Sequence, residues 1–219
     1  MILLETATAA TVPQSLSLWE LCVSGGWIMI VLAALLLVGI YIAVERAITV
    51  AKASKQDETF MKRIRDYIHD GEIDAAKELC RNSDTPYGRL IGKGISRIGR
   101  PMNDVLVTIE NTGNMEIAAL SKGLSWLATI AGAAPMLGFL GTVIGMVESF
   151  YAIAASGNSA QIGDFAGGIY TALVTTVAGL IVGIIAMFAY NYLVARVNKV
   201  MNMLEARTMD FMDLLNEPA

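Results

Sequence analysis

Hydroxyl side chains lie in or beside two long segments of the chain that contain no charged residue. Thr142 and Ser149 belong to the first segment or its border, and Thr171, Thr175 and Thr176 belong to the second. A hydroxyl in hydrocarbon can satisfy itself by bonding back to its own helix. Several hydroxyls on one face also suit a lumen that holds water or a partner helix. The chemistry we expect here is hydrogen bonding, and no residue pattern indicates covalent catalysis.

Small side chains recur in the same two segments at steps of three and four residues, which places them on one face of each helix. Small faces let membrane helices approach closely, and Gly141/Gly145 and Gly179/Gly183 have the spacing typical of such contacts. Helix packing alone and a pore therefore both explain these small faces. The first face consists of Ala128, Ala131, Pro135, Gly138, Thr142, Gly145 and Ser149, and the second of Gly168, Ala172, Thr176, Gly179, Gly183 and Ala186.

Ionisable residues are absent from the interior of these segments. Glu148 and Asp164 lie at the two ends of the short stretch between them. They are either two ordinary solvated carboxylates or an outer mouth that attracts cations. Membrane ion carriers usually need an ionisable group at depth. If this protein conducts protons, the carboxylate that carries them should therefore come from another chain.

The distribution of positive charge predicts three transmembrane helices and their orientation. All 16 Lys and Arg residues lie within residues 46–122 and 196–207. Uncharged apolar runs cover 21–44, 123–147 and 165–195, and a spanning helix needs about 20 such residues. Because basic residues stay on the cytoplasmic side, we expect an all-α integral membrane protein that exposes both basic stretches to the cytoplasm.

The predicted organisation follows from this orientation. The first apolar run follows no basic residue, so we expect an anchored span and not a cleaved signal peptide. The segments are an outer, periplasmic N-terminal segment (1–20), transmembrane helix 1 (21–44), a cytoplasmic helical domain (45–122), transmembrane helix 2 (123–147), a periplasmic loop (148–164), transmembrane helix 3 (165–195) and a cytoplasmic C-terminal helix (196–219).

Helix signals continue beyond the spans. In the cytoplasmic domain we expect helices over 55–69, ending near Gly71, over 73–79, and over 87–98, capped by Thr85 and Pro86. The helix of the second span should begin early, near Pro101, with Asn103 or Asp104 as its cap. The third span should continue as helix over 197–215. Its apolar positions there are Val197, Val200, Met201, Leu204, Met209, Met212 and Leu215.

Several classes of function lack support in the sequence. Residues 45–122 carry thirteen basic and twelve acidic residues, so a nucleic-acid-binding surface is not expected. Cys22 and Cys80 fall on opposite sides of the membrane and cannot pair, and no Cys/His cluster indicates a metal site. There is no phosphate-binding loop of the GxxxxGK[ST] type. We therefore expect no cofactor, no catalytic residue and no enzymatic activity.

Two segments of the chain resemble membrane helices of a known family. Residues 120–146, with Ala134-Pro135, Leu137-Gly138 and Gly141-Thr142-Val143-x-Gly145, resemble the second membrane helix of the MotA/TolQ/ExbB proton-channel family. Residues 168–180, followed by Tyr190-Asn191, resemble its third helix. Three spans with a large inner loop after the first indicate the ExbB/TolQ branch, and not the flagellar stator branch.

The resemblance implies a motor subunit of the bacterial inner membrane that assembles as a homopentameric ring. Spans two and three then line a pore that holds the single-span helix of an ExbD/TolR-type partner, whose Asp relays protons, and a TonB-like protein receives the work. Thr142 and Thr176 match the family's two pore threonines, and Thr171 stands where enteric relatives carry Glu. The remaining pore-lining positions would be Thr175, Pro135, Gly138, Gly145 and Ser149, with Glu148 and Asp164 at the outer mouth.

The leading interpretation is thus an ExbB-like subunit that drives TonB-dependent uptake across an outer membrane. A TolQ-like role in envelope integrity, or in a gliding or secretion motor, remains an alternative within the family, and so does sodium coupling. A structural membrane scaffold is an alternative of another class. A secondary transporter is disfavoured, because three spans show neither inverted repeats nor broken helices.

Overall fold

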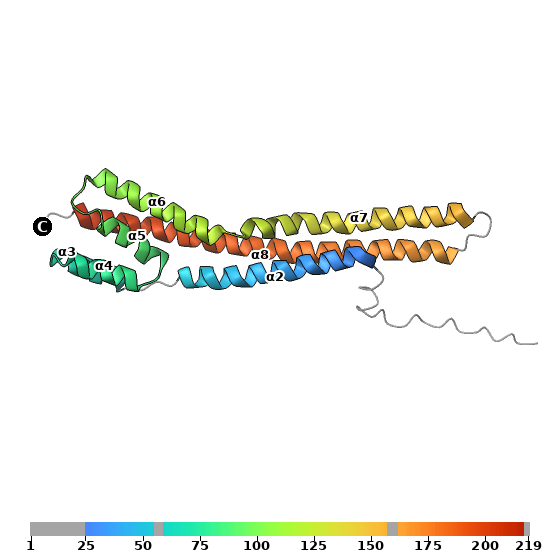
Figure 1. Cartoon of the computed structure of the whole chain (residues 1–219), viewed down its shortest axis with the longest axis horizontal. Helices are drawn as coiled ribbons and strands as arrows, with labels where there is room; N and C mark the ends of the chain where they lie inside the picture. The colour runs from blue at the N-terminus through green and yellow to red at the C-terminus, as the bar shows by residue number, and fades with distance from the viewer. Residues whose placement is uncertain (1–24, 55–58, 157–161, 217–219) are drawn as a thin grey trace, which may run out of the picture. The chain divides into compact units, whose positions relative to one another are not determined.

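The structure is a computed structural model that describes residues 25–54, 59–156 and 162–216. Within these ranges every regular element is an α-helix, which confirms the predicted all-α class for the described part of the chain. The helices are α2 (Gly26–Ala53), α3 (Phe60–His69), α4 (Ile73–Asn82), α5 (Pro86–Ile95), α6 (Met102–Ser121), α7 (Leu124–Ser156) and α8 (Ile162–Asn216) (Figure 1).

Three stretches of helix are long and apolar enough to cross a membrane, as predicted. They are Gly26–Ala53, Met102–Ala155 and Ala166–Asn216. Large apolar side chains stay exposed along them, for example Ile30 on α2 and Phe139 on α7. A soluble protein rarely exposes contiguous apolar surface of this kind, whereas lipid covers it without cost. The fold is therefore that of a multi-pass membrane protein.

The third apolar run continues as helix far beyond the need of the bilayer. α8 has 55 residues, which at 1.5 Å per residue is about 80 Å, against a hydrocarbon core of roughly 30 Å. The predicted helix over 197–215 is confirmed. Its buried side chains include Val197, Val200 and Leu204, as the apolar rhythm indicates, but Met209 is 68% exposed and Phe211 is buried in its place.

The stretch Met102–Ala155 is divided between two helices. α6 begins after Pro101, near the predicted start, but no side chain of Asn103 or Asp104 caps it. It ends at Ser121, and α7 begins at Leu124. Gly123 lies between them with φ +87°, a left-handed conformation that only glycine adopts readily. The expectation of one helix from Pro101 through the span is wrong at this residue.

The contacts divide the chain into two compact units. The first comprises residues up to Leu35 and Ala133–Val182, and the second comprises Leu36–Gly132 and Gly183–Ala219. α2, α7 and α8 each supply residues to both. The first unit holds the close contact between α7 and α8.

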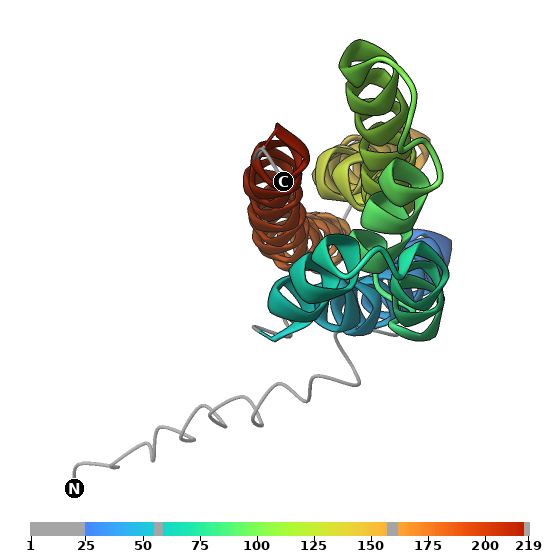
Figure 2. The ribbon, with the colours of Figure 1, turned by 90° about the vertical axis from the view of Figure 1, so that its left-hand side faces the viewer.

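The second unit packs the short helices α3, α4 and α5 with α6 and parts of α2 and α8 around one apolar core (Figures 1 and 2). Ile64 of α3, Ile91 of α5, Ile109 of α6 and Phe211 of α8 are fully buried there. Gly94 makes this packing possible, since a Cβ at Gly94 would lie 2.7 Å from Phe211 Cε1 and 2.8 Å from Ile109 Cδ1.

Local signals explain the helices of the second unit. The Thr85 hydroxyl accepts a hydrogen bond of 3.1 Å from the Gly88 amide, and Pro86 follows at the first helical position, which confirms the predicted start of α5. α3 ends at His69, before Gly71 with φ +76°, as expected. The part of the predicted helix over 55–58 lies outside the described residues.

Cys80 is inert in this unit. Its side chain is 3% exposed, and burial raises the pKa of its thiol to about 12. Since the thiolate is the nucleophile, Cys80 will react slowly with thiol reagents in the folded protein on either side of a membrane. Cys22 lies outside the described residues.

We predict that Phe211→Ala destabilises the second unit. Removing a fully buried aromatic side chain costs about 3–5 kcal/mol of the free energy of unfolding, because a cavity remains. Thermal unfolding of the detergent-solubilised protein should show a clearly lower midpoint. Val107→Ala is the control, since Val107 is 45% exposed, and equal midpoints for the two variants would contradict the packing described here.

Candidate functional site: the contact between α7 and α8

Helices α7 and α8 meet in the first unit through glycine (Figure 1). A Cβ at Gly138 would lie 2.8 Å from the carbonyl oxygen of Thr175 and 3.1 Å from Gly179 Cα. A Cβ at Gly179 would lie 2.6 Å from the carbonyl oxygen of Ala134. These neighbours are backbone atoms and cannot rotate away, so the two positions accept only glycine at this distance between the helices.

The same contact continues toward the end of α7. A Cβ at Gly145 would lie 2.9 Å from the Cβ of Ala172 and 3.2 Å from the carbonyl oxygen of Gly168. Ser149 is 4% exposed and donates a hydrogen bond of 2.8 Å to the carbonyl oxygen of Gly145. A Cβ at Gly168 would collide with the Ser149 hydroxyl. The small side chains on both helices are therefore matched position by position.

Two threonines of α8 join the helices by hydrogen bonds. The Thr176 hydroxyl donates to the carbonyl oxygen of Gly138 at 3.1 Å. Thr175 is 2% exposed, and its hydroxyl lies 2.7 Å from the carbonyl oxygen of Ala172 and 3.3 Å from that of Gly138. Both hydroxyls thus have acceptors inside one chain, which is what a polar group in hydrocarbon requires.

Three predicted pore residues lie at the border of this contact. Thr142 is half-buried and donates at 2.6 Å to the carbonyl oxygen of Phe139, one turn back on its own helix. Thr171 and Pro135 are half-buried too, and Pro135 lies inside α7 without ending it. Each of these three residues is therefore partly exposed at the surface of the helix pair.

The predicted outer-mouth carboxylates are placed less completely. Glu148 is exposed near the end of α7. Asp164 belongs to α8, but its side chain lies outside the described residues. Among the described residues, no group of three or more His, Cys, Asp or Glu side chains is arranged to hold a metal ion.

The structure thus brings five of the predicted residues into one contact: Gly138, Gly145, Ser149, Thr175 and Thr176. Packing within one chain accounts for their size, and their pore-lining role remains a prediction. The predicted small face omits Ala134, which is fully buried against Gly179. The signal was present, since Ala134, Gly138, Gly141 and Gly145 follow at steps of four, three and four.

Long apolar helices joined by a contact of small residues define a helical, multi-pass membrane protein. Residues 82–206, more than half of the chain, match the MotA/TolQ/ExbB proton channel family. The chain belongs to this family, and its relatives indicate the ExbB/TolQ branch. The family is one of proton channels and transport motors, and it is not known as a family of enzymes.

Three relatives illustrate the match. An ExbB homologue of Methanothermobacter thermautotrophicus is 31% identical over 188 residues, which are 85% of this chain and 66% of that protein, so the chain spans just under two thirds of its length. The biopolymer transport protein ExbB of Neisseria gonorrhoeae is 31% identical over 166 residues, 69% of this chain and 74% of that protein. The Tol-Pal system protein TolQ of Haemophilus influenzae is 39% identical over 87 residues, 40% of this chain and 38% of that protein.

We predict that Gly179→Ala disrupts the contact of α7 with α8. The added methyl group would meet the backbone of Ala134 and Gly138, and overpacking of this kind costs about 1–3 kcal/mol. The yield and the thermal midpoint of the solubilised protein should both fall. Gly132→Ala is the matched control, because a Cβ there meets nothing within 4 Å; if both variants behave alike, the close contact is refuted.

Proposed function

We propose that this chain is an ExbB-like subunit of a motor in the bacterial inner membrane that converts the proton-motive force into mechanical work. The observation that carries the proposal is a contact between α7 and α8 that is packed through glycine, in a chain of the proton channel family. The hydroxyl of Thr176 lies in this contact and that of Thr142 at its border. Each charge that crosses the membrane releases about 2.3 kcal/mol per 100 mV, so proton flow can drive the motor without ATP.

In this proposal five copies form a ring, and α7 and α8 line its pore. Large exposed side chains on α7 support contacts beyond the single chain, since Met136 is 74% and Phe139 is 65% exposed. The pore admits the single-span helix of an ExbD/TolR-type partner, which supplies the Asp that α7 and α8 lack within the membrane. A TonB-like protein then transmits the work to uptake across an outer membrane.

A second candidate is the TolQ-like role in envelope integrity. It is supported by the similarity to Haemophilus influenzae TolQ, which has a higher identity over a shorter segment than the ExbB relative from Neisseria gonorrhoeae. Both roles use the same pore, so substitutions of pore residues test either role. Loss of TonB-dependent uptake in a deletion strain, with intact envelope constriction, distinguishes the first role from the second.

We predict a closed ring of five copies. Native mass spectrometry of the protein after mild detergent extraction should show a pentamer as the main species. A stable monomer under these conditions would contradict the proposed motor, because a single pair of helices encloses no pore.

The proposed orientation has the N-terminus in the periplasm and the C-terminus in the cytoplasm. Cys80 is too buried to report on it, so both native cysteines are replaced by Ala and one exposed cysteine is introduced. A membrane-impermeant maleimide should label Tyr151→Cys, at the end of α7, in intact cells. It should label Lys62→Cys, on α3, only after lysis. Labelling of Lys62→Cys before lysis would reverse the topology.

The threonine hydroxyls at the pore give the most direct test of function. Thr142→Val keeps the shape of the side chain and removes its hydroxyl, and a hydrated lumen should then lose a hydrogen-bonding group worth about 1–3 kcal/mol. Assembly should be normal, while potential-driven uptake falls strongly at matched expression. Thr176→Val should lower uptake too, but it also removes the hydrogen bond to Gly138 and should weaken packing.

The controls separate these effects. Thr142→Ser and Thr176→Ser restore a hydroxyl and should restore uptake. Thr129→Val removes an exposed hydroxyl that bonds to its own helix at the Ser125 carbonyl oxygen, and it should have little effect. Full activity of both Thr142→Val and Thr176→Val would show that these hydroxyls serve packing alone and that the proton path lies elsewhere.

A further inference from the structure

A broad basic groove lies in the second unit between α4, α5 and α6. Its volume is about 980 Å³, and its walls carry five basic and two acidic side chains, a formal excess of three positive charges. Arg89 holds both carboxylates, with 2.7 Å to Glu116 and 3.3 Å to Asp84. The remaining positive charges of the groove are therefore not balanced by its own acidic residues.

Three basic side chains of this groove are available to a partner. They are Arg81 of α4, Lys93 of α5, and Arg97, which follows α5. None of the three has an ion-pair partner among the described residues. Met115 of α6 lines the same groove and is 74% exposed. A fitting occupant would therefore present carboxylates beside an apolar side chain.

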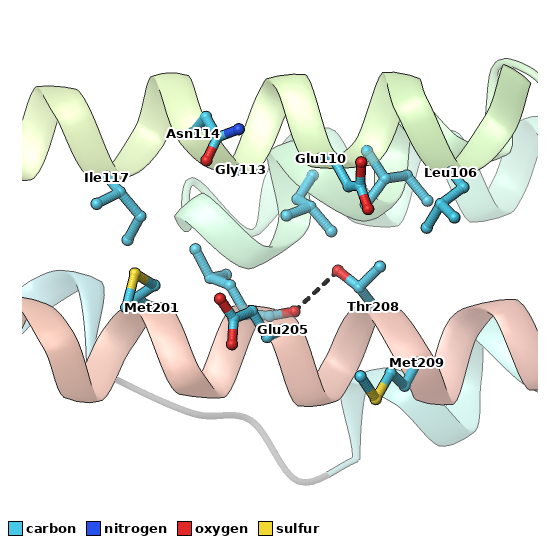
Figure 3. A pocket seen from close by; sticks show the side chains of 12 residues that line it. Leu106, Glu110, Gly113, Asn114, Ile117, Met201, Glu205, Thr208 and Met209 are labelled. Carbon is cyan, nitrogen blue, oxygen red and sulfur yellow. Dashed lines mark hydrogen bonds between the residues drawn. The ribbon is translucent and has the colours of Figure 1, made fainter. Parts of the chain in front are cut away.

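The same unit presents such a surface on another helix. Glu205, Met209 and Asp213 follow one another at steps of four on α8, which places them on one face, and all three are exposed. We call them the α8 ridge. Figure 3 shows Glu205 and Met209 along α8, with Glu110 of α6 adding a carboxylate to the adjoining groove of about 410 Å³. Neither Glu205 nor Asp213 has an ion-pair partner among the described residues.

The ridge and the basic groove cannot meet within one chain as it is folded. Only α4, α5, α6 and the residues that adjoin them line the basic groove, and no residue of α8 reaches it. The two surfaces differ and complement each other in charge. Copies that pair through them make a heterologous contact, in which the ridge of each copy binds the groove of the next. Such a contact generates a ring wherever the rotation closes.

We propose that the basic groove of one copy receives the α8 ridge of a neighbouring copy, with Glu205 and Asp213 facing Arg81, Lys93 and Arg97, and Met209 packing near Met115. An amphipathic helix laid into a groove is a common mode of recognition, and opposite charges fix its register. The proposal rests on the ring of the proposed function and names the cytoplasmic contact that helps to hold it together.

Zero-length cross-linking tests the contact directly. One tagged copy carries Glu205→Gln and Asp213→Asn, and a second copy with another tag carries Lys77→Arg and Lys93→Arg. The first copy keeps Lys93 and the second keeps Glu205 and Asp213. After co-expression and purification of the full chains, a carbodiimide can therefore link Lys93 to Glu205 or Asp213 only between differently tagged copies. We expect peptides that link Lys93 of the first copy to Glu205 or Asp213 of the second. Their absence, while native mass spectrometry shows an intact ring, overturns this contact and leaves the proposed motor standing.

Charge reversal provides an independent readout. Lys93→Glu with Arg97→Glu, and separately Glu205→Lys with Asp213→Lys, should each lower the ratio of oligomer to monomer by about tenfold. The protein that carries all four changes has the charges exchanged and should regain assembly. Lys62→Glu with Arg65→Glu, on the exposed side of α3, is the matched control. The proposal is overturned if both double variants assemble unchanged or if the fourfold variant does not recover. It is also overturned if Lys93 is cross-linked to an acidic segment of another protein.

Discussion

The approach of two backbones at Gly138 and Gly179 sets the arrangement of the first unit. Lipid offers no hydrophobic driving force between helices, so association depends on close packing and on hydrogen bonds. Glycine supplies the first of these by letting α7 and α8 touch through main-chain atoms. It also brings the carbonyl oxygen of Gly138 within reach of Thr176, 3.1 Å away. Packing and polar satisfaction therefore depend on the same small side chains.

In the second unit the constraint is different, because many charged side chains lie on its surface and burial of apolar area drives folding. Short helices with one apolar face each pack on the long α6 and α8, and Phe211 fills the centre. The end of α6 also meets a basic side chain, since Arg46 lies 3.4 Å from the carbonyl oxygen of Ala119. A cation at a helix C-terminus is favourable there, and it ties α2 to α6 beside the turn at Gly123.

Much of this fold follows from simple sequence patterns. Charge and hydropathy were enough for the three membrane segments, and the Thr85-Pro86 pair gave the start of α5. The interruption at Gly123 was not predictable, because a helix tolerates an isolated glycine and only the packing of α6 and α7 decides whether it turns. The inclusion of Met209 failed for another reason. The buried positions 193, 197, 200, 204, 211 and 214 of α8 keep steps of three, four and seven, and Met209 falls outside that series whereas Phe211 falls within it.

The candidate site shows a limit of another kind. Small residues at steps of three and four predict a close helix contact and a narrow pore equally well, because both demand the same side chains. The structure assigns Gly138, Gly145 and Ser149 to a contact within one chain. A pattern cannot express that distinction, since periodicity gives the face of a helix and not the partner that covers it.

The hydrogen bonds of this contact bear on how ions can pass. Among the described residues no buried polar side-chain atom lacks a partner, so the closed face between α7 and α8 has no need of water. In the proposed motor the hydrated path therefore runs along the border of the contact, where Thr142 and Thr171 are half-buried. These hydroxyls can orient water but do not titrate near neutral pH. In the proposed motor the chain thus supplies an apolar wall with hydroxyls at its edge, and the ExbD/TolR-type partner contributes the group that takes up and releases a proton.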